Sequence, residues 1–419
     1  MVETDKHIIS LEAIKEAGER LKDIVDVTPF QKHEELSRAY EANIFLKRED
    51  LQVVRSFKIR GAYNKIKSLP EEELVHGVVC ASAGNHAQGV AMTCAKLQIP
   101  GVIFMPNPTP QQKIKKVQHF GGDLIEIILS GDSYDEAQEA AKTYAEQKQC
   151  AFIHPFDDEE VIAGQGTIAL EMHQQAKNPL DIILVAVGGG GLVAGVGSYF
   201  KQIHPSPHII AIEAKGAPSM HQSLKAGSIQ KLENIDTFAD GIAVKKVGQI
   251  PFQIGQQVID QSIIVDEGKV CSTILKLYNE DAIVVEPAGA ISIAALDQLE
   301  ELIKGKNVGI IVCGGNNDVG RTQEITEKAL LYENKKHYFL IRFPQRAGAL
   351  RDFLHVLGPN DDITHFQYTK KNNRSNGPAL VGIELEKSSD FTPLIERLKS
   401  NKIRFQHINN DAMLFEILV

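Results

Sequence analysis

Lys58 is the residue of this chain whose placement is most typical of covalent chemistry. It lies in Ser56-Phe57-Lys58-Ile59-Arg60-Gly61-Ala62, where a lysine follows an aromatic residue at the predicted start of a helix. Amide groups at a helix start carry partial positive charge, which disfavours an ammonium and leaves more of the amine free to attack an aldehyde. Lys58 is therefore a candidate Schiff-base lysine. Most of the 45 Lys and Arg residues must lie on the solvated surface, so this hypothesis depends on further segments that complete a site.

A run of four glycines is the second such segment. Residues 181–187, which are apolar after Asp181, predict a buried strand that is followed by the glycines and then by a helix start. Residues without Cβ let backbone N–H groups converge on a phosphate, and the helix amino end adds a favourable dipole. The predicted phosphate-binding residues are Gly188, Gly189, Gly190, Gly191 and Leu192.

A second loop follows another short apolar run. Its residues are Ser82, Ala83, Gly84, Asn85 and His86, and a helical segment comes next. We expect Ser82 to cap that helix and the free amides of the loop to receive a substrate carboxylate. The Asn85 side chain can donate a hydrogen bond to a phenolic oxygen. His86 is interpreted as a packed histidine beside Asn85, not as a catalyst.

The glycine run also permits a different reading. Gly189, Gly191 and Ala194 fit the G-x-G-x-x-A pattern of dinucleotide-binding proteins, and Glu213 ends a strand-like run at about the expected distance. A nicotinamide-dependent dehydrogenase would use them in that way. A dehydrogenase, however, needs neither the Lys58 motif nor a second glycine-asparagine loop, so a phosphate-bearing aldehyde cofactor explains more of the chain.

Together these segments resemble the pyridoxal-phosphate enzymes of the tryptophan-synthase β-subunit fold group, and most closely the biosynthetic threonine dehydratases. The resemblance extends over nearly the whole chain. Its further motifs are Thr28-Pro29, Lys47-Arg48-Glu49-Asp50, Asp240-Gly241-Ile242-Ala243-Val244, Glu286-Pro287-Ala288-Gly289-Ala290 and Cys313-Gly314-Gly315-Asn316.

The resemblance implies a complete set of cofactor-binding residues. These are Lys58, Phe57, Asn85, Gly188, Gly189, Gly190, Gly191, Leu192 and Cys313. Lys58 would hold the aldehyde and then act as the base at the substrate Cα, and Cys313 would lie beside the ring nitrogen. A neutral thiol cannot stabilise a pyridinium as a carboxylate does, which favours elimination over transamination. The implied activity is that of a threonine ammonia-lyase, which forms 2-oxobutanoate and ammonia at the first step of isoleucine biosynthesis.

Related racemases and serine dehydratases hold a divalent ion through a glutamate, a backbone carbonyl and an aspartate. The corresponding positions here are Glu213, Ala217 and Ser219. Because serine replaces the carboxylate that a hard cation requires, we predict no metal at this position. Glu213 is expected to take part in a polar network instead.

The alternation of strand-like and helical runs up to about residue 320 predicts βαβ units and parallel sheets covered by helices. The expected fold class is α/β, with a catalytic domain of fold type II over residues 1–330. By the resemblance this domain has two α/β subdomains with the cofactor between them, and the smaller one spans roughly residues 51–156. A charged linker is predicted at residues 331–336.

The remaining residues, 337–412, follow a βαββαβ order typical of ferredoxin-like domains. They resemble the ACT-like regulatory domains of biosynthetic threonine dehydratases, which implies feedback inhibition by L-isoleucine, with L-valine as an alternative effector. A dimerisation module without a ligand remains an alternative, because a fold alone does not establish a function.

Composition excludes several functional classes. A net charge of −9 argues against a nucleic-acid surface, and the five cysteines lack C-x-x-C spacing, which fits a reducing cytoplasm. No signal peptide or membrane-spanning run is predicted. We expect a homo-oligomer, either a dimer or a tetramer. L-threonine is the expected substrate and L-serine the alternative.

Two other functions remain open. One is a catabolic threonine/serine dehydratase or a serine racemase, which typically lacks the C-terminal domain. The other is an amino-acid-sensing protein with a degenerate enzyme core. The presence of Lys58, Asn85, the four glycines and Cys313 in one chain argues against a degenerate core.

Overall fold

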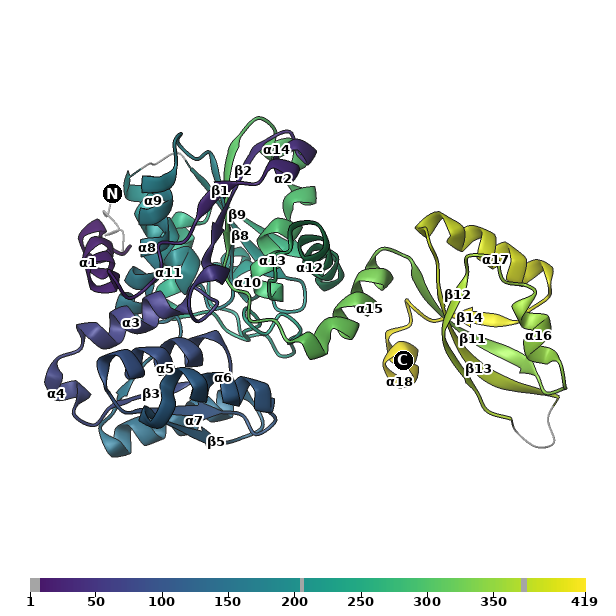
Figure 1. The fold of residues 1–419 in the computed structure, drawn as a ribbon, viewed down its shortest axis with the longest axis horizontal. Helices are drawn as coiled ribbons and strands as arrows, with labels where there is room; N and C mark the ends of the chain where they lie inside the picture. The colour runs from purple at the N-terminus through teal and green to yellow at the C-terminus, as the bar shows by residue number, and fades with distance from the viewer. Residues whose placement is uncertain (1–7, 204–206, 371–374) are drawn as a thin grey trace. The chain divides into compact units, whose positions relative to one another are not determined.

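The computed structural model describes residues 8–203, 207–370 and 375–419. Its contacts divide the chain into two compact units. The first comprises residues up to Glu267 and Leu277–Asp318, and the second comprises Gly268–Lys276 and Val319–Val419. Figure 1 shows the fold of each unit. Together they have the predicted fold class, an α/β catalytic part followed by a ferredoxin-like C-terminal part.

A six-stranded sheet forms the larger part of the first unit, in the order β1-β2-β10-β7-β8-β9. All neighbouring strands are parallel except the β1–β2 pair. Every residue of β7 is buried, as expected for a parallel strand covered on both faces. The strand bounds are β1 Phe30–Lys32, β2 Asn43–Arg48, β7 Ile182–Ala186, β8 His208–Ala214, β9 Gln261–Val265 and β10 Asn307–Val312.

Two long helices of this part of the chain are α8 (Glu159–Gln175), with 17 residues, and α9 (Gly191–Ile203), with 13. Glycines let these two helices approach closely, since a Cβ on Gly195 would lie 2.4 Å from the carbonyl oxygen of Ile162. The other helix bounds are α1 Leu11–Leu21, α2 Glu34–Ala39, α10 Ser219–Ala226, α11 Gln249–Val258, α13 Pro287–Ala294 and α14 Glu300–Ile303. Helix α12, Glu267–Asp281, is divided between the two units, because its residues Gly268–Lys276 belong to the second.

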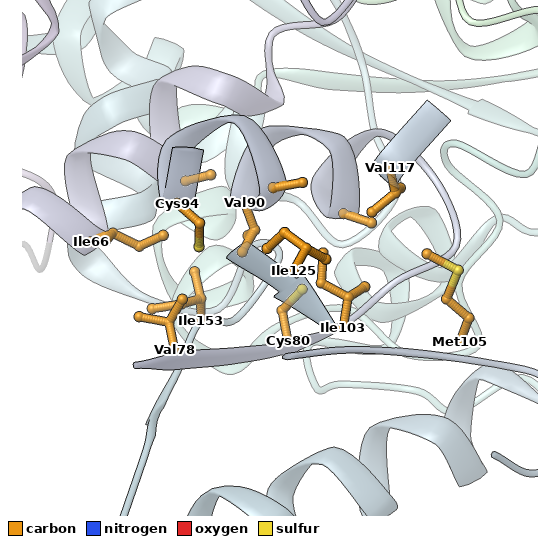
Figure 2. Close-up of a cluster of buried hydrophobic side chains, with 13 residues drawn as sticks. Ile66, Val78, Cys80, Val90, Cys94, Ile103, Met105, Val117, Ile125 and Ile153 are labelled. Carbon is orange, nitrogen blue, oxygen red and sulfur yellow. The ribbon is translucent and has the colours of Figure 1, made fainter. Parts of the chain in front are cut away.

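A second, four-stranded parallel sheet lies within the predicted small subdomain, in the order β5-β4-β3-β6. Its strands are β3 Val78–Ala81, β4 Gly101–Met105, β5 Ile125–Leu129 and β6 Ala151–Phe152. The helices of this segment are α3 Lys58–Ser68, α4 Glu71–Leu74, α5 Asn85–Leu97, α6 Gln111–Gly121 and α7 Tyr134–Lys148. Figure 2 shows how Val90 and Cys94 of α5 pack against sheet residues such as Cys80 and Ile103 in a fully buried cluster.

The second unit contains the predicted βαββαβ order and forms a four-stranded antiparallel sheet, β12-β13-β11-β14. Its elements are α15 Thr322–Tyr332, β11 Lys336–Pro344, α16 Ala349–Leu354, β12 Asp362–Tyr368, β13 Asn376–Glu384, α17 Phe391–Ser400, β14 Phe405–His407 and α18 Ala412–Leu418. The predicted linker at residues 331–336 thus includes the end of α15 and the first residue of β11.

The two faces of this sheet follow the period of two of its strands. Phe339 and Ile341 of β11 pack in one cluster with Leu394 of α17, whereas Tyr338 packs in another with Leu414 of α18. Helix α18 was not predicted from the sequence. Short 3-10 turns complete the chain at Glu49–Leu51, Gly122–Leu124, Leu296–Gln298, Val319–Arg321 and Ser388–Asp390. In the described part of the chain, no helix combines the length and apolarity that a membrane span requires.

Candidate active site

Lys58 is held against the end of the central strand β10. As predicted, it is the first residue of α3. The Phe57 N–H donates to the carbonyl of Cys313 over 3.1 Å, and the Gly315 N–H donates to the carbonyl of Arg55 over 2.8 Å. These two hydrogen bonds bring the Lys58 and Cys313 motifs together, although they are far apart in the sequence.

Burial makes the Lys58 amine unusually easy to deprotonate. Its Nζ donates to the carbonyl of Pro155 over 2.9 Å and lies 5.2 Å from the centre of the Phe57 ring. Burial lowers the pKa of Lys58 from 10.5 to about 8, against smaller opposing effects of Cys313 and Glu286. The helix dipole was the cause expected from the sequence. In the structure the main cause is the loss of solvation.

The glycine run forms a tight turn between β7 and α9. Gly190 has a φ of 94°, and a Cβ on Gly189 would lie 2.3 Å from the ring of Phe156. Among the described residues, no protein acceptor meets the N–H groups of Gly190, Gly191 and Leu192 at the start of α9. Such N–H groups at a helix start are available to an anion.

The loop Ser82 to His86 lies at the end of β3, but Ser82 does not cap α5. The helix begins at Asn85, and Gly84 occupies the cap position without a side-chain hydrogen bond. The Ser82 hydroxyl accepts from the Gly84 N–H over 3.1 Å instead. The predicted cap is therefore wrong, because Ser82 precedes the cap residue by two positions and its hydroxyl accepts from the Gly84 N–H. The N–H groups in the first turn of α5 remain available to a ligand.

Asn85 and His86 have different environments. Asn85 Nδ2 donates to Glu286 Oε1 over 2.6 Å, and Asn85 Oδ1 accepts from Asn316 Nδ2 over 2.7 Å. His86 Nε2 lies 2.9 Å from the carbonyl oxygen of Ile153, and burial lowers the pKa of His86 to about 3. His86 is therefore neutral near pH 7, which agrees with a packed histidine.

A cavity of about 290 Å³ collects most of these groups at the carboxyl ends of parallel strands. The predicted residues that line it are Lys58, Ser82, Ala83, Gly84, Asn85, His86 and Gly189. The predicted residues outside its lining are Phe57, Gly188, Gly190, Gly191, Leu192 and Cys313. Cys313 is buried and close enough to Lys58 to influence the pKa of that lysine. Its Sγ donates to the carbonyl of Ala288 over 3.1 Å, and burial raises the pKa of Cys313 well above 9.0.

Sequence reasoning did not include several polar residues of this cavity among the site residues. They are Lys113, Lys116, Asp240, Glu286 and Asn316. Lys113 forms an ion pair with Asp240, and Lys116 donates to Asn316. Asp240, Glu286 and Asn316 belong to motifs that carry the family resemblance, so these motifs could have identified them as site residues. The two lysines lie on α6, and nothing in their spacing points to a site.

Glu213 has the structural role that the sequence predicts. Its two carboxylate oxygens accept from the backbone N–H groups of Met220 and His221, over 2.8 and 2.6 Å, at the start of α10. Burial raises the pKa of Glu213 to about 8, while these two hydrogen bonds favour the ionised form. Over the described ranges, no group of three His, Cys, Asp or Glu side chains could hold a metal ion.

Comparisons with known proteins agree with this arrangement. Residues 21–314 match the family described as pyridoxal-phosphate dependent enzyme, and residues 327–418 match the C-terminal regulatory domain of threonine dehydratase. Among solved structures, the processed form of threonine deaminase isoform 2 from Solanum lycopersicum is 42% identical, with a TM-score of 0.72 over 76% of this chain and 87% of that chain. Maize serine racemase is 34% identical, with a TM-score of 0.72 over 78% and 99%.

Curated relatives match over almost the full length. The biosynthetic L-threonine dehydratase of Halalkalibacterium halodurans is 54% identical over 412 residues, which cover 98% of this chain and 99% of that protein. The corresponding protein of Bacillus subtilis is 53% identical over 416 residues, covering 99% of each chain. The dinucleotide reading of the glycine run is thereby overturned, and the chain belongs to the pyridoxal-phosphate dependent enzymes and, within them, to the family of the biosynthetic L-threonine dehydratases.

Proposed function

We propose that this enzyme deaminates L-threonine to 2-oxobutanoate and ammonia, the first step of isoleucine biosynthesis, with L-serine as the alternative substrate. The observation that carries the proposal is the cavity in which a buried, readily deprotonated Lys58 faces the Ser82 to His86 loop. The full-length likeness to biosynthetic dehydratases supports the choice of substrate.

The residues present fit pyridoxal phosphate group by group. Lys58 offers an amine for the aldehyde, and the N–H groups at the start of α9 offer a cradle for the phosphate. A Cβ on Gly189 would occupy the space beside Phe156, so only glycine leaves this turn as it is. We assign the phenolic oxygen to Asn85 and the ring nitrogen to the neutral Cys313 thiol.

When bound, the cofactor supplies an electron sink for the charge that develops at the substrate Cα. The protein supplies the base, orients the substrate and limits access of water. Lys58 removes the Cα proton, for which a neutral amine with a pKa of about 8 is well suited. The N–H groups of Ala83, Asn85 and His86 orient the substrate carboxylate, since those of Ser82 and Gly84 donate to the carbonyl of Phe104 and to the Ser82 hydroxyl. The buried walls of the cavity limit access of water to the reacting atoms.

The pH dependence of Lys58 reactivity gives one test. Because only the neutral amine attacks an aldehyde, the rate at which the apoprotein captures pyridoxal phosphate should rise with pH through about 8 and then level off. Stopped-flow absorbance across a series of buffers would measure this midpoint. A midpoint near the ordinary lysine value of 10.5 would contradict a desolvated Lys58.

A second test addresses the phosphate cradle. Gly189→Ala would place a methyl group 2.3 Å from the Phe156 ring, so the turn must shift and the cofactor should bind about 10- to 100-fold more weakly. Equilibrium titration of the apoprotein with pyridoxal phosphate measures this. Gly227→Ala is the control, because a Cβ there meets nothing within 4 Å, and its φ of 69° makes the variant a test of backbone strain away from the cavity. Equal losses of cofactor affinity in both variants would show that the turn at Gly189 has no particular role in binding the phosphate.

We further propose that residues 1–330 carry catalysis, that residues 331–336 connect the domains, and that residues 337–412 bind L-isoleucine, or L-valine, as a feedback inhibitor. The family match of residues 327–418 to a regulatory domain supports this. We also propose a cytoplasmic homo-oligomer, either a dimer or a tetramer. A catabolic dehydratase or serine racemase is the second candidate, favoured only by the likeness of the catalytic part to racemases.

One assay tests the main proposal. Purified enzyme is supplied with L-threonine or L-serine, with and without L-isoleucine, and 2-oxo acid formation is followed. We expect 2-oxobutanoate from threonine and strong suppression by isoleucine. Activity that is indifferent to isoleucine would refute the proposed effector and keep the reaction. D-serine formed from L-serine would support the racemase, and no turnover with either substrate would revive the degenerate sensor.

A further inference from the structure

The orientation of the Asn85 amide is determined by its neighbours in the cavity wall. Asn316 Nδ2 donates both to the carbonyl of Val54 over 2.8 Å and to Asn85 Oδ1 over 2.7 Å. A carbonyl can only accept, so the Asn316 nitrogen must face Val54 and its second hydrogen must point to Asn85. On the opposite edge, Asn85 Nδ2 donates to Glu286 Oε1 over 2.6 Å.

This arrangement leaves a hydrogen-bond donor of Asn85 available to a ligand. An ionised carboxylate only accepts hydrogen bonds, so Glu286 requires the Asn85 nitrogen on its side. The amide oxygen is already used by Asn316, and one Asn85 Nδ2 hydrogen is used by Glu286. The second Nδ2 hydrogen remains, and Asn85 lines the cavity. Asn85 is therefore presented to the cavity as a donor.

Glu286 is built into the site and has little freedom to move. Its side chain is 5% exposed, and its backbone N–H donates to the carbonyl of Gly314 over 3.2 Å. A Cβ on Gly314 would lie 2.2 Å from Glu286 Oε1, so a glycine at this position is what allows the carboxylate to approach. The Glu286 side chain does not cap α13, although the residue occupies the cap position.

Opposing influences act on the protonation of the Glu286 carboxyl group. Burial raises its pKa to about 7 and Asp240 adds to this, while the hydrogen bonds from Asn85 and from the Asn316 backbone favour the ionised form. The titratable groups that act on it or feel its charge are Asp240, Lys113, Lys58, Lys116 and Cys313.

We propose that Glu286 is a positioning residue that holds the Asn85 amide as a hydrogen-bond donor, so that the cofactor is bound with its phenolic oxygen in the deprotonated, accepting form. The proposal rests on the assignment of Asn85 to the phenolic oxygen made above. Glu286 need not contact the substrate. It acts through Asn85, and the consequence is a bias in the protonation state of the bound cofactor.

The test uses Glu286→Met, which keeps the approximate shape of the side chain and removes the acceptor. Cofactor with a protonated phenolic oxygen absorbs at shorter wavelength than cofactor with a deprotonated one, so the ratio of the two absorption bands of the holoenzyme at pH 8 reports the bias. Loss of one hydrogen bond to a charged acceptor should change this ratio about tenfold toward the shorter-wavelength band. Glu286→Gln keeps one acceptor oxygen and should change it less in the same direction.

Two controls separate this role from others. Asp240→Asn removes a negative charge from the same cavity without touching the hydrogen bonds of Asn85, and should leave the band ratio close to that of the original enzyme. Glu213→Gln replaces another buried glutamate, outside the cavity lining, and should change stability only. Asn85→Ala should reproduce the effect of Glu286→Met.

The outcomes distinguish this inference from the proposed function. If the original enzyme develops no visible band with pyridoxal phosphate, the proposed function itself fails. If Asn85→Ala shifts the bands and both Glu286 variants do not, the positioning role is refuted and the function stands. If Asp240→Asn shifts them toward the shorter-wavelength band as much as Glu286→Met, the effect does not depend on the hydrogen bond to Asn85 and the inference is overturned.

Discussion

Lys58→Ala is expected to lower kcat for threonine deamination by about 10³-fold or more, since general base catalysis alone is worth about 10²- to 10⁴-fold and the covalent attachment of the cofactor is lost as well. Alanine keeps the helical start of α3 and leaves the hydrogen bond from the Phe57 N–H to the Cys313 carbonyl in place. The fold should therefore survive. The measurements are 2-oxobutanoate formation at saturating threonine and the visible absorption of the protein after incubation with pyridoxal phosphate.

Lys67→Ala is the matched control for this experiment. Lys67 lies in the last turn of the same helix, and its side chain is exposed. Its loss should leave kcat and cofactor absorption unchanged. If Lys58→Ala retained most of the turnover, another group would have to act as the base, and the sensor-like reading of the chain would need to be reconsidered.

Arg60→Ala is expected to lower the free energy of unfolding of the catalytic part by about 3 to 5 kcal/mol, because it leaves buried charges without a partner. Arg60 is fully buried. Its guanidinium donates to both carboxylate oxygens of Glu49, each over 2.8 Å, and to both oxygens of Glu171 over 2.6 and 3.0 Å. Lys47 also donates to Glu171, over 2.5 Å.

This network connects the helix that carries Lys58 to two other segments of the chain. Glu49 follows β2, Arg60 lies in α3 and Glu171 lies in α8. Burial on its own would raise the pKa of Glu49, but the nearby Arg60 brings it below the ordinary value. The carboxylate is thus ionised and depends on Arg60, so the loss of stability should extend to the position of Lys58 and weaken cofactor binding.

Calorimetry suits the measurement, because a chain with two compact units need not unfold in one step and the affected transition can be followed separately. Lys304→Ala is the control, since Lys304 forms an ion pair with Glu41 in which both side chains are exposed. No measurable change is expected there, as for most surface ion pairs. An equally stable Arg60→Ala protein would mean that water or a neighbouring side chain replaces the guanidinium.

Much of the fold could be predicted from the sequence, because strands and helices leave patterns in residues that are adjacent in the chain. The apolar run before the glycines is β7, and the βαββαβ order of the C-terminal part is present. Apolar runs bounded by glycine, and alternation with a period of two, reflect the burial of each segment alone. Helix α18 was missed because its short apolar pattern carries no capping signal apart from Asp411.

The site was predicted only in part. Lys58, Asn85 and Gly189 do line one cavity, as their motifs implied. The capping role expected of Ser82 is wrong, because its hydroxyl reaches the Gly84 N–H before the helix begins. The reduced basicity of Lys58 was expected, but its main cause is burial by residues that the motif does not contain.

The sequence by itself determined the family, the candidate lysine and the segments that could meet a phosphate, since each depends on residues adjacent in the chain. Only the tertiary structure decided which polar groups meet in the cavity. Asn85 lies 201 residues from Glu286 and 231 from Asn316, and no local pattern encodes hydrogen bonds over such separations. Whether Asn85 faces the cavity as a donor depends on the packing of β10 against the Lys58 segment, because that packing brings Asn316, Glu286 and Asn85 into contact.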